Sequence, residues 1–185
     1  MTEIVALPRT VLDRVKAEVR AASWFAALGE PLTDGDRADA VSYATALGLA
    51  DPGTDFAHDW PEAEALLKAP DWSPVWWDRE EAVRRELLGR AEARYPKHAL
   101  WTALTELTTE AGELLHGKAA TAAGRMGDAA RASIHVAAGA ASQAVYQLAV
   151  ARLAGEEGSP FESKFRLFAA GRWPLGIVGS RLILF

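Results

Sequence analysis

The segment 98–116 carries the residues whose types and spacing best suit metal chemistry. Glu106, Glu110 and Glu113 stand at positions i, i+4 and i+7, which places their carboxylates on one stripe of a helix. His116 follows Glu113 by three residues, the Glu-x-x-His spacing that carboxylate di-metal bundles use. Carboxylate oxygens and imidazole nitrogens are suitable ligands for Mg²⁺, Mn²⁺, Fe²⁺ or Zn²⁺. The four residues therefore form a candidate divalent-metal site, with the identity of the metal left open.

The apolar side of the same segment supports a second interpretation. Leu100, Leu104 and Leu107 recur at the spacing of a buried helix face. At about 100° per residue, the glutamate stripe lies roughly 120° from the middle of that face. A di-metal site has to point into the protein, whereas a stripe turned this far suits a solvated acidic face. We favour the solvated face and keep the metal site as the alternative.

Two short acidic motifs extend the metal hypothesis. Glu110 and Glu113 form a Glu-x-x-Glu pair, and Asp128 lies on the segment that follows. In these residues the chain resembles the helical pyrophosphohydrolases of the MazG type, which hold Mg²⁺ against a nucleotide with such a pair and a later Glu-x-x-Asp pair. Arg125 stands where that family has the glutamate of its second pair, so one ligand is replaced by a positive charge. Over about 20 residues, the resemblance implies a magnesium-dependent nucleotide hydrolase with Asp128 as a further ligand.

A second group of polar residues lies in the alanine-rich segment 118–153. Asp128, Arg131 and His135 are spaced i, i+3 and i+7, and Tyr146 continues the same stripe. A buried line of this kind would bind a small anion or change the pKa of the histidine, which makes Arg131, His135 and Tyr146 candidate ligand-binding residues. The other interpretation, which we favour, is an ordinary polar face with local ion pairs.

The elements that must position these residues are helices. Apolar residues recur at helical spacing, and glycine or proline marks the predicted ends. Thr33 is expected to cap the second helix, with Asp36 as its capping-box partner. The predicted helices span residues 8–28, 34–47, a short stretch between Asp59 and Pro70, and then 74–95, 98–116, 118–153 and 161–170. The expected fold is therefore all-α, a single-domain bundle of about six helices over residues 1–185.

The two ends of the chain differ from the rest in composition. Residues 3–7 and 181–185 are apolar and contain β-branched residues, so each is a strand candidate. A small β pairing of the N- and C-terminal segments would have to pack on the helices, since an isolated pair is marginal in water. Residues 50–60 are predicted to form a loop, because Asp51-Pro52-Gly53 favours a turn.

Seven tryptophans are present, and four of them lie between residues 60 and 77. Tryptophan side chains are mostly buried in proteins, which favours a small hydrophobic cluster beneath a loop-rich segment. An exposed aromatic surface for a partner or ligand is the alternative.

Composition excludes several classes of function. The absence of cysteine excludes disulfides and thiolate chemistry and fits a reducing, cytoplasmic location. No stretch has the roughly 18 apolar residues of a membrane helix, and residues 1–7 do not have the pattern of a signal peptide. A net charge of −5 disfavours nucleic acid as a partner, and the arginines between 79 and 94 alternate with glutamates (Glu80, Glu81, Glu86, Glu92), as on a salt-bridged helix face.

The sequence predicts no specific activity. We expect a soluble helical interaction or binding protein that self-associates as a homo-oligomer, because alanine-rich helices pack closely and no catalytic motif is evident. A protein partner would fit the same expectation. The alternative is a metal-dependent helical hydrolase, and a third option is a small-molecule site around Arg131, His135 and Tyr146.

Overall fold

The computed structural model describes residues 6–185, which form seven α-helices, one 3₁₀ helix and a four-stranded sheet. The helices are α1 (Arg9–Ala21), α2 (Asp34–Ala46), α3 (Trp60–Leu67), α4 (Val75–Arg94), α5 (Lys97–Met126), α6 (Ile134–Ala154) and α7 (Pro160–Ala169), with the 3₁₀ helix η1 at Asp128–Ser133. The strands are β1 (Gly53–Phe56), β2 (Trp72–Ser73), β3 (Pro174–Val178) and β4 (Arg181–Leu184). The predicted helical character is confirmed, and the sheet is an addition to the predicted all-α class.

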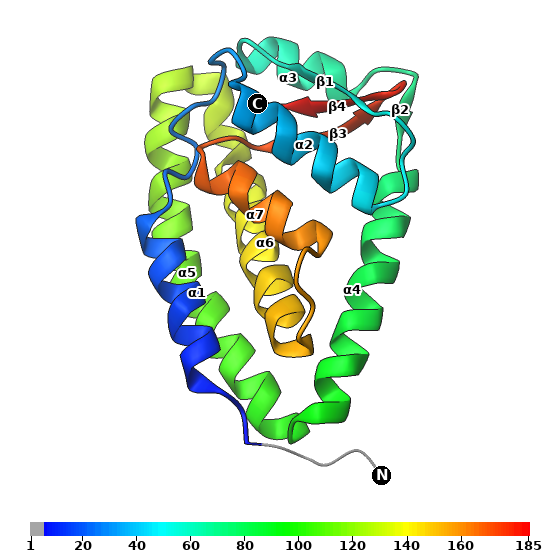
Figure 1. The fold of residues 1–185 in the computed structure, drawn as a ribbon. Helices are drawn as coiled ribbons and strands as arrows, with labels where there is room; N and C mark the ends of the chain where they lie inside the picture. The colour runs from blue at the N-terminus through cyan, green and yellow to red at the C-terminus, as the bar shows by residue number, and fades with distance from the viewer. Residues whose placement is uncertain (1–5) are drawn as a thin grey trace.

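Helix α6 is the centre of the arrangement. Helices α4 and α5 meet at one end of the molecule and diverge, α6 runs between them with α7 beside it, and the sheet lies at the opposite end (Figure 1). From Ala144 to Ala151 every residue of α6 except Tyr146 is buried, because α1, α4, α5 and α7 all contact this helix. Small side chains allow such close approach of several neighbours. The alanine-rich composition of α6 therefore serves close packing within the protomer.

Side chains cap the starts of two helices, and the cap of α2 is the predicted one. At the start of α2, the Thr33 hydroxyl accepts from the Asp36 amide at 3.1 Å, and the Asp36 carboxylate accepts from the Thr33 amide at 2.9 Å. At α3, the Asp59 carboxylate accepts from the Glu62 amide at 2.9 Å. Each contact satisfies an amide that the helix itself leaves without a partner.

Two predicted boundaries are wrong. Helix α5 does not end at Gly117 but continues to Met126, since Ala119, Ala122 and Ala123 are buried beyond it. A glycine inside a helix costs only about 1 kcal/mol, which this burial offsets. The predicted helix 118–153 is instead divided at Gly127, whose φ of +98° is incompatible with an α-helix.

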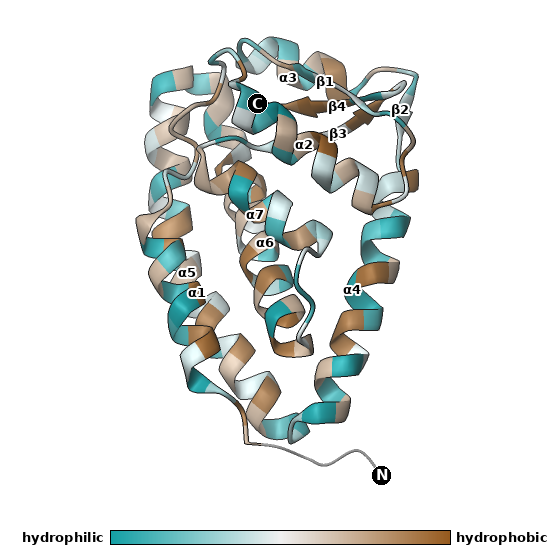
Figure 2. Ribbon diagram, in the orientation of Figure 1, coloured by the Kyte–Doolittle hydropathy of each residue, from teal (hydrophilic) through white to brown (hydrophobic). Residues whose placement is uncertain are grey.

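The sheet has the order β1-β4-β3-β2 (Figure 1). Strand β4 pairs antiparallel with β3 and parallel with β1. The C-terminal strand is therefore confirmed, whereas its predicted N-terminal partner, residues 3–7, lies mostly outside the described residues. The loop predicted at 50–60 is wrong at 53–56, which β4 draws into the sheet. Strands β3 and β4 are among the most apolar elements (Figure 2), and nearly all of their side chains are buried.

A buried arginine joins the sheet to the helices. Arg172 forms an ion pair with Asp36 at 3.0 Å and donates to the carbonyl oxygens of Ala27, Glu30 and Pro31. Its position directly before Trp173 fixes the start of β3 relative to α2. This contact holds the sheet end of the candidate site in place.

Candidate functional site

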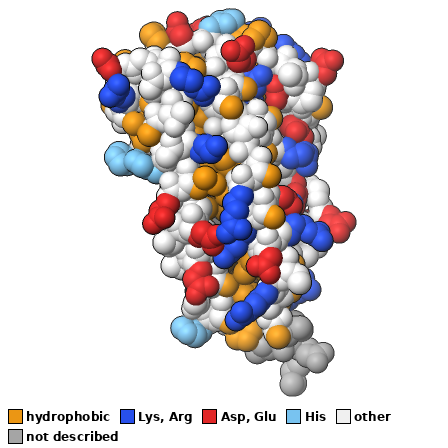
Figure 3. Space-filling view, turned by 90° about the vertical axis from the view of Figure 1, so that its left-hand side faces the viewer, with side chains coloured by type: hydrophobic (Ala, Val, Ile, Leu, Met, Phe, Trp, Pro, Cys, Tyr) orange, Lys and Arg blue, Asp and Glu red, His pale blue; other side chains and the backbone are white. Residues whose placement is uncertain are grey.

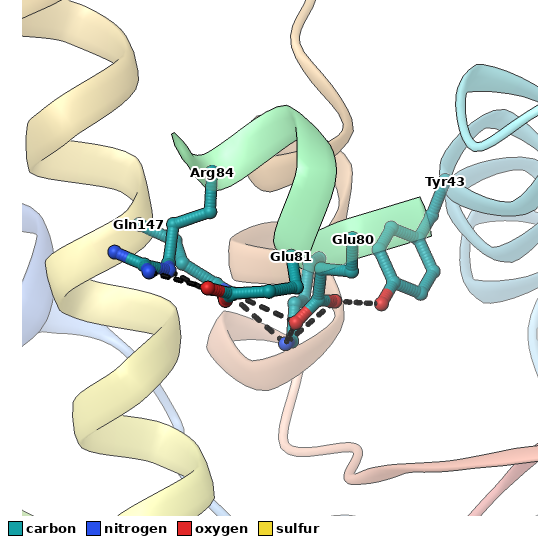
Figure 4. Close-up of polar contacts among 6 residues, drawn as sticks. Tyr43, Glu80, Glu81, Arg84 and Gln147 are labelled. Carbon is teal, nitrogen blue, oxygen red and sulfur yellow. Dashed lines mark hydrogen bonds and ion pairs between the residues drawn. The ribbon is translucent and has the colours of Figure 1, made fainter. Parts of the chain in front are cut away.

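Glu80 and Lys164 form an ion pair that is buried inside the protein. Glu80, on α4, accepts two hydrogen bonds from Lys164 Nζ, on α7, at 2.8 Å to each carboxylate oxygen. Gln147 Nε2, from α6, donates to Glu80 Oε1 at 2.7 Å, and the Tyr43 hydroxyl, from α2, donates to Glu80 Oε2. Figure 4 shows the Glu80 carboxylate between Tyr43 and Gln147. Four helices thus meet at one carboxylate.

The hydrogen bonds explain how this pair is tolerated inside the protein. Each of the two side chains is only 9% exposed, and a buried charge without partners is strongly unfavourable. Lys164 also donates to Gln147 Oε1 at 3.0 Å, so the ammonium and the carboxylate are both well provided with partners. Burial lowers the pKa of Lys164, against the opposing effect of Glu80. Burial and the Glu80 charge together raise the pKa of Tyr43 well above its ordinary value.

A cavity of about 630 Å³ opens beside this pair. We call it the tryptophan cavity, because Trp72, Trp76 and Trp77 form one wall. Trp77 meets Trp72 at a ring angle of 86° and Trp76 at 64°, with ring centroids 6.0 and 5.7 Å apart. The remaining lining comes from α3, α4, α6, α7 and the segment at the start of β3. It comprises Leu67, Asp78, Glu80, Glu81, Val136, Ala140, Gln143, Lys164, Phe168 and residues 173–175.

Two indole N–H groups at this wall have no hydrogen-bond partner. The Nε1 atoms of Trp72 and Trp76 are both buried and unpaired, although a buried indole normally finds an acceptor. Both nitrogens lie close to Gly176, where a Cβ would be 2.8 Å from Trp72 Nε1 and 3.2 Å from Trp76 Nε1. Gly176 also has a φ of +147°, so only glycine fits this bulge of β3 without strain. Two donors without acceptors are an unusual feature for the wall of a cavity.

Negative charge predominates in the lining. Asp78, Glu80 and Glu81 contribute carboxylates, and Lys164 contributes the single ammonium. Glu81 is paired with Arg84, whose hydrogen bonds of 2.5 and 2.7 Å lower the pKa of Glu81. Within residues 6–185, Asp78 forms no ion pair, and its side chain is exposed. The cavity therefore has an uncompensated negative charge near its entrance.

The residues predicted to bind a metal are spread along a solvent-exposed surface. Glu110 pairs with Lys16 at 2.7 Å and with Arg20, and hydrogen bonds from these two cations lower its pKa. Glu106 and Glu113 are exposed on the same helix. Figure 3 shows acidic and basic side chains intermingled on the side of the molecule that carries α1 and α5. In residues 6–185, no three histidine or acidic side chains are placed to hold one metal ion.

Within residues 6–185, residues of the predicted sites come together in two places. The rings of His116 and His135, which belong to different predicted sites, lie 5.1 Å apart between centroids. Asp128 is 94% exposed and pairs with Arg131 at 3.1 Å, as the local ion-pair interpretation expects. Tyr146 lies eleven residues beyond His135, about 16 Å along α6, so one small ligand does not reach both. The metal and ligand assignments stay predictions.

Sequence reasoning missed the residues at the centre of the structure. The salt-bridged face predicted for α4 is confirmed for Glu81 and Arg84 but is wrong for Glu80, which is buried. The spacing contained the signal: Glu80 follows Trp76 by four residues and precedes Leu87 by seven, on the apolar face. Lys164 similarly lies three residues after Phe161 and four before Phe168, both buried.

Both interpretations of the tryptophans are correct for part of the set. Trp76 is buried and Trp60 packs against the core, as a hydrophobic cluster predicts. Trp77 is 57% exposed at the cavity, as an aromatic surface predicts.

Comparison with known proteins finds no match among family models, curated proteins or solved structures. None of the helices in residues 6–185 has both the length and the apolar character needed to cross a membrane.

Proposed function

We propose that this protein binds a small organic molecule in the tryptophan cavity. The observation that carries the proposal is the combination of a cavity of about 630 Å³ with two buried indole N–H groups that have no acceptor in its wall. Sites for small molecules are concave and mostly apolar, with a few polar groups that orient the ligand, and occupy roughly 300–1,000 Å³. Trp72 and Trp76 line the cavity, so a ligand bound there contacts the rings that carry these unpaired donors.

Two variants make the proposal testable. Ala140→Phe places a ring in the cavity from α6, and Trp77→Ala removes the exposed wall. Trp101→Ala is the matched control, because Trp101 is also exposed but lies on α5, away from the cavity. A fragment library is screened by thermal shift, and each binder is titrated by NMR against the three variants. We expect binders that lose about tenfold or more in affinity with Ala140→Phe and keep it with Trp101→Ala. If every binder is insensitive to both cavity variants, the proposal is wrong.

Self-association is a second candidate function. Trp77, Val136 and Leu67 are large apolar side chains that are exposed around the cavity, and such clusters favour contact with another molecule. The argument for self-association from the alanine-rich composition is weaker, since the alanines of α6 pack inside the protomer. Sedimentation equilibrium over a hundredfold range of concentration tests it, and a constant monomer mass would exclude it. A cytoplasmic location and a protein partner stay predictions.

Metal-dependent hydrolysis receives less support from the geometry. The carboxylate of Glu110 already has two cationic partners, Lys16 and Arg20, which a metal ion would have to displace. The resemblance to MazG-type enzymes therefore rests on Glu113 and Asp128, which are both exposed.

A further inference from the structure

The lining of the tryptophan cavity combines negative charge with aromatic surface. The lining contains three carboxylates and one ammonium group, that of Lys164. The Glu80 carboxylate accepts two hydrogen bonds from this ammonium and neutralises its charge. Arg84 neutralises Glu81, which leaves the charge of Asp78 without a partner in residues 6–185. A ligand with a positive charge is therefore favoured over a neutral or anionic one.

The tryptophan rings provide a surface that attracts cations. Indole is the best aromatic partner for a cation within about 6 Å of its ring, and recognition of quaternary ammonium groups is a recurrent use of such rings. Trp77 packs edge-to-face on Trp72 and Trp76 and is itself 57% exposed at the cavity, so its ring is open to a bound cation. The apolar remainder of the lining, such as Val136 and Leu175, suits methyl groups.

Hydrogen-bonding capacity distinguishes a quaternary ammonium from a primary one. A primary ammonium brings three N–H donors that need acceptors when they leave water. Glu80, the deepest carboxylate, already accepts from Tyr43, Gln147 and Lys164, and the indole groups of the wall are donors rather than acceptors. A quaternary ammonium has no N–H group and needs only aromatic faces and a nearby negative charge.

We propose, on the basis of the proposed ligand-binding function, that the tryptophan cavity binds a small quaternary ammonium compound of the choline type. The trimethylammonium group contacts Trp77 and the neighbouring Trp72, and Asp78 supplies the compensating charge. The same headgroup occurs in trimethyllysine side chains of proteins, but the size of the cavity favours a free small molecule.

The test compares choline with 3,3-dimethylbutan-1-ol, its uncharged analogue of equal shape, by isothermal titration calorimetry. We expect choline to bind about tenfold more tightly or better, because only the charge differs. Ethanolamine, with a primary ammonium, is expected to bind at least about tenfold more weakly than choline. Equal binding of choline and the neutral analogue, or of choline and ethanolamine, would overturn the inference.

Variants locate the binding. Trp77→Ala and Asp78→Asn are each expected to weaken choline binding by about fivefold or more, and Glu113→Gln, an exposed acid on α5, is the control expected to leave it unchanged. An unchanged affinity in Asp78→Asn would also overturn the inference. So would a trimethyllysine peptide that binds tenfold more tightly than choline, because it would identify a modified protein as the source.

The outcome separates this inference from the proposed function. If choline fails to bind while other fragments bind in a manner sensitive to Ala140→Phe, the quaternary ammonium inference is wrong and the proposed function stands. If no compound is sensitive to Ala140→Phe, both are wrong.

Discussion

Replacement of Lys164 by methionine tests whether the Glu80–Lys164 pair holds the helices together. The change keeps much of the length of the side chain and removes its ammonium, which makes three hydrogen bonds of 2.8, 2.8 and 3.0 Å. Because both partners are only 9% exposed, solvent screens the pair little. Removal of one member of a buried pair leaves the other charge uncompensated and costs about 3–5 kcal/mol. We expect Lys164→Met to lower the free energy of unfolding by that amount at pH 7.

Urea denaturation followed by circular dichroism provides the assay, with Arg166→Met as a control on the same helix. Arg166 pairs with Asp39 at 2.7 Å, but the two side chains are 51% and 24% exposed, so its loss should cost at most about 1 kcal/mol. The double variant Glu80→Leu/Lys164→Met replaces the pair by apolar side chains and should be more stable than Lys164→Met alone. The reasoning would be refuted if Lys164→Met cost no more than Arg166→Met. It would also be refuted if the effects of Glu80→Leu and Lys164→Met on the free energy of unfolding were additive.

Three further predictions follow from the same geometry. Tyr43→Phe removes a hydrogen bond to a charged group and should cost about 1.5–3 kcal/mol at pH 7. Because the pKa of Tyr43 is raised in the folded state, wild-type stability should fall more steeply above pH 10 than that of the variant, so the two denaturation midpoints should approach each other between pH 8 and 11. Gly176→Ala should destabilise by more than about 1 kcal/mol, because its Cβ would lie 2.8 Å from an indole nitrogen at a φ of +147°, whereas Gly112→Ala, with free space in α5, should stabilise by about 0.5–1 kcal/mol in thermal melts. In thermal melts, we expect none of Mg²⁺, Mn²⁺, Zn²⁺ or Fe²⁺ to raise the melting temperature above that measured with EDTA. A saturable rise with one metal that is lost in Glu113→Ala would restore the metal hypothesis.

Local signals in the sequence predicted the local features of the fold. The capping pair Thr33 and Asp36 is formed by residues three apart, so its pattern is visible without knowledge of the rest of the chain. The same holds for the ion pair between Glu81 and Arg84. By contrast, β1 has only four residues and becomes a strand because it pairs with β4, which is more than 120 residues away. Propensity does not encode such a distant pairing.

The candidate site was hidden for a related reason. A pattern of alternating charges groups Glu80 with the other glutamates of α4. Its spacing from Trp76, however, places Glu80 on the buried face of the helix. Its partner Lys164 comes from α7, and no periodicity links the two residues. A charge on an apolar helix face is the pattern that should be sought first, because it needs an opposite charge elsewhere in the protein.

The large separation of Lys164 from Glu80 in the sequence has a consequence for biosynthesis. Lys164 follows Glu80 by 84 residues, so α7 leaves the ribosome after α2, α4 and α6. Until then, the Glu80 carboxylate has no cation, so it favours water over the apolar surface of α6. Stable docking of α2 and α4 should therefore wait until α7 has been synthesised. A nascent chain that ends before residue 160 is expected to expose apolar surface and to be a substrate for chaperones.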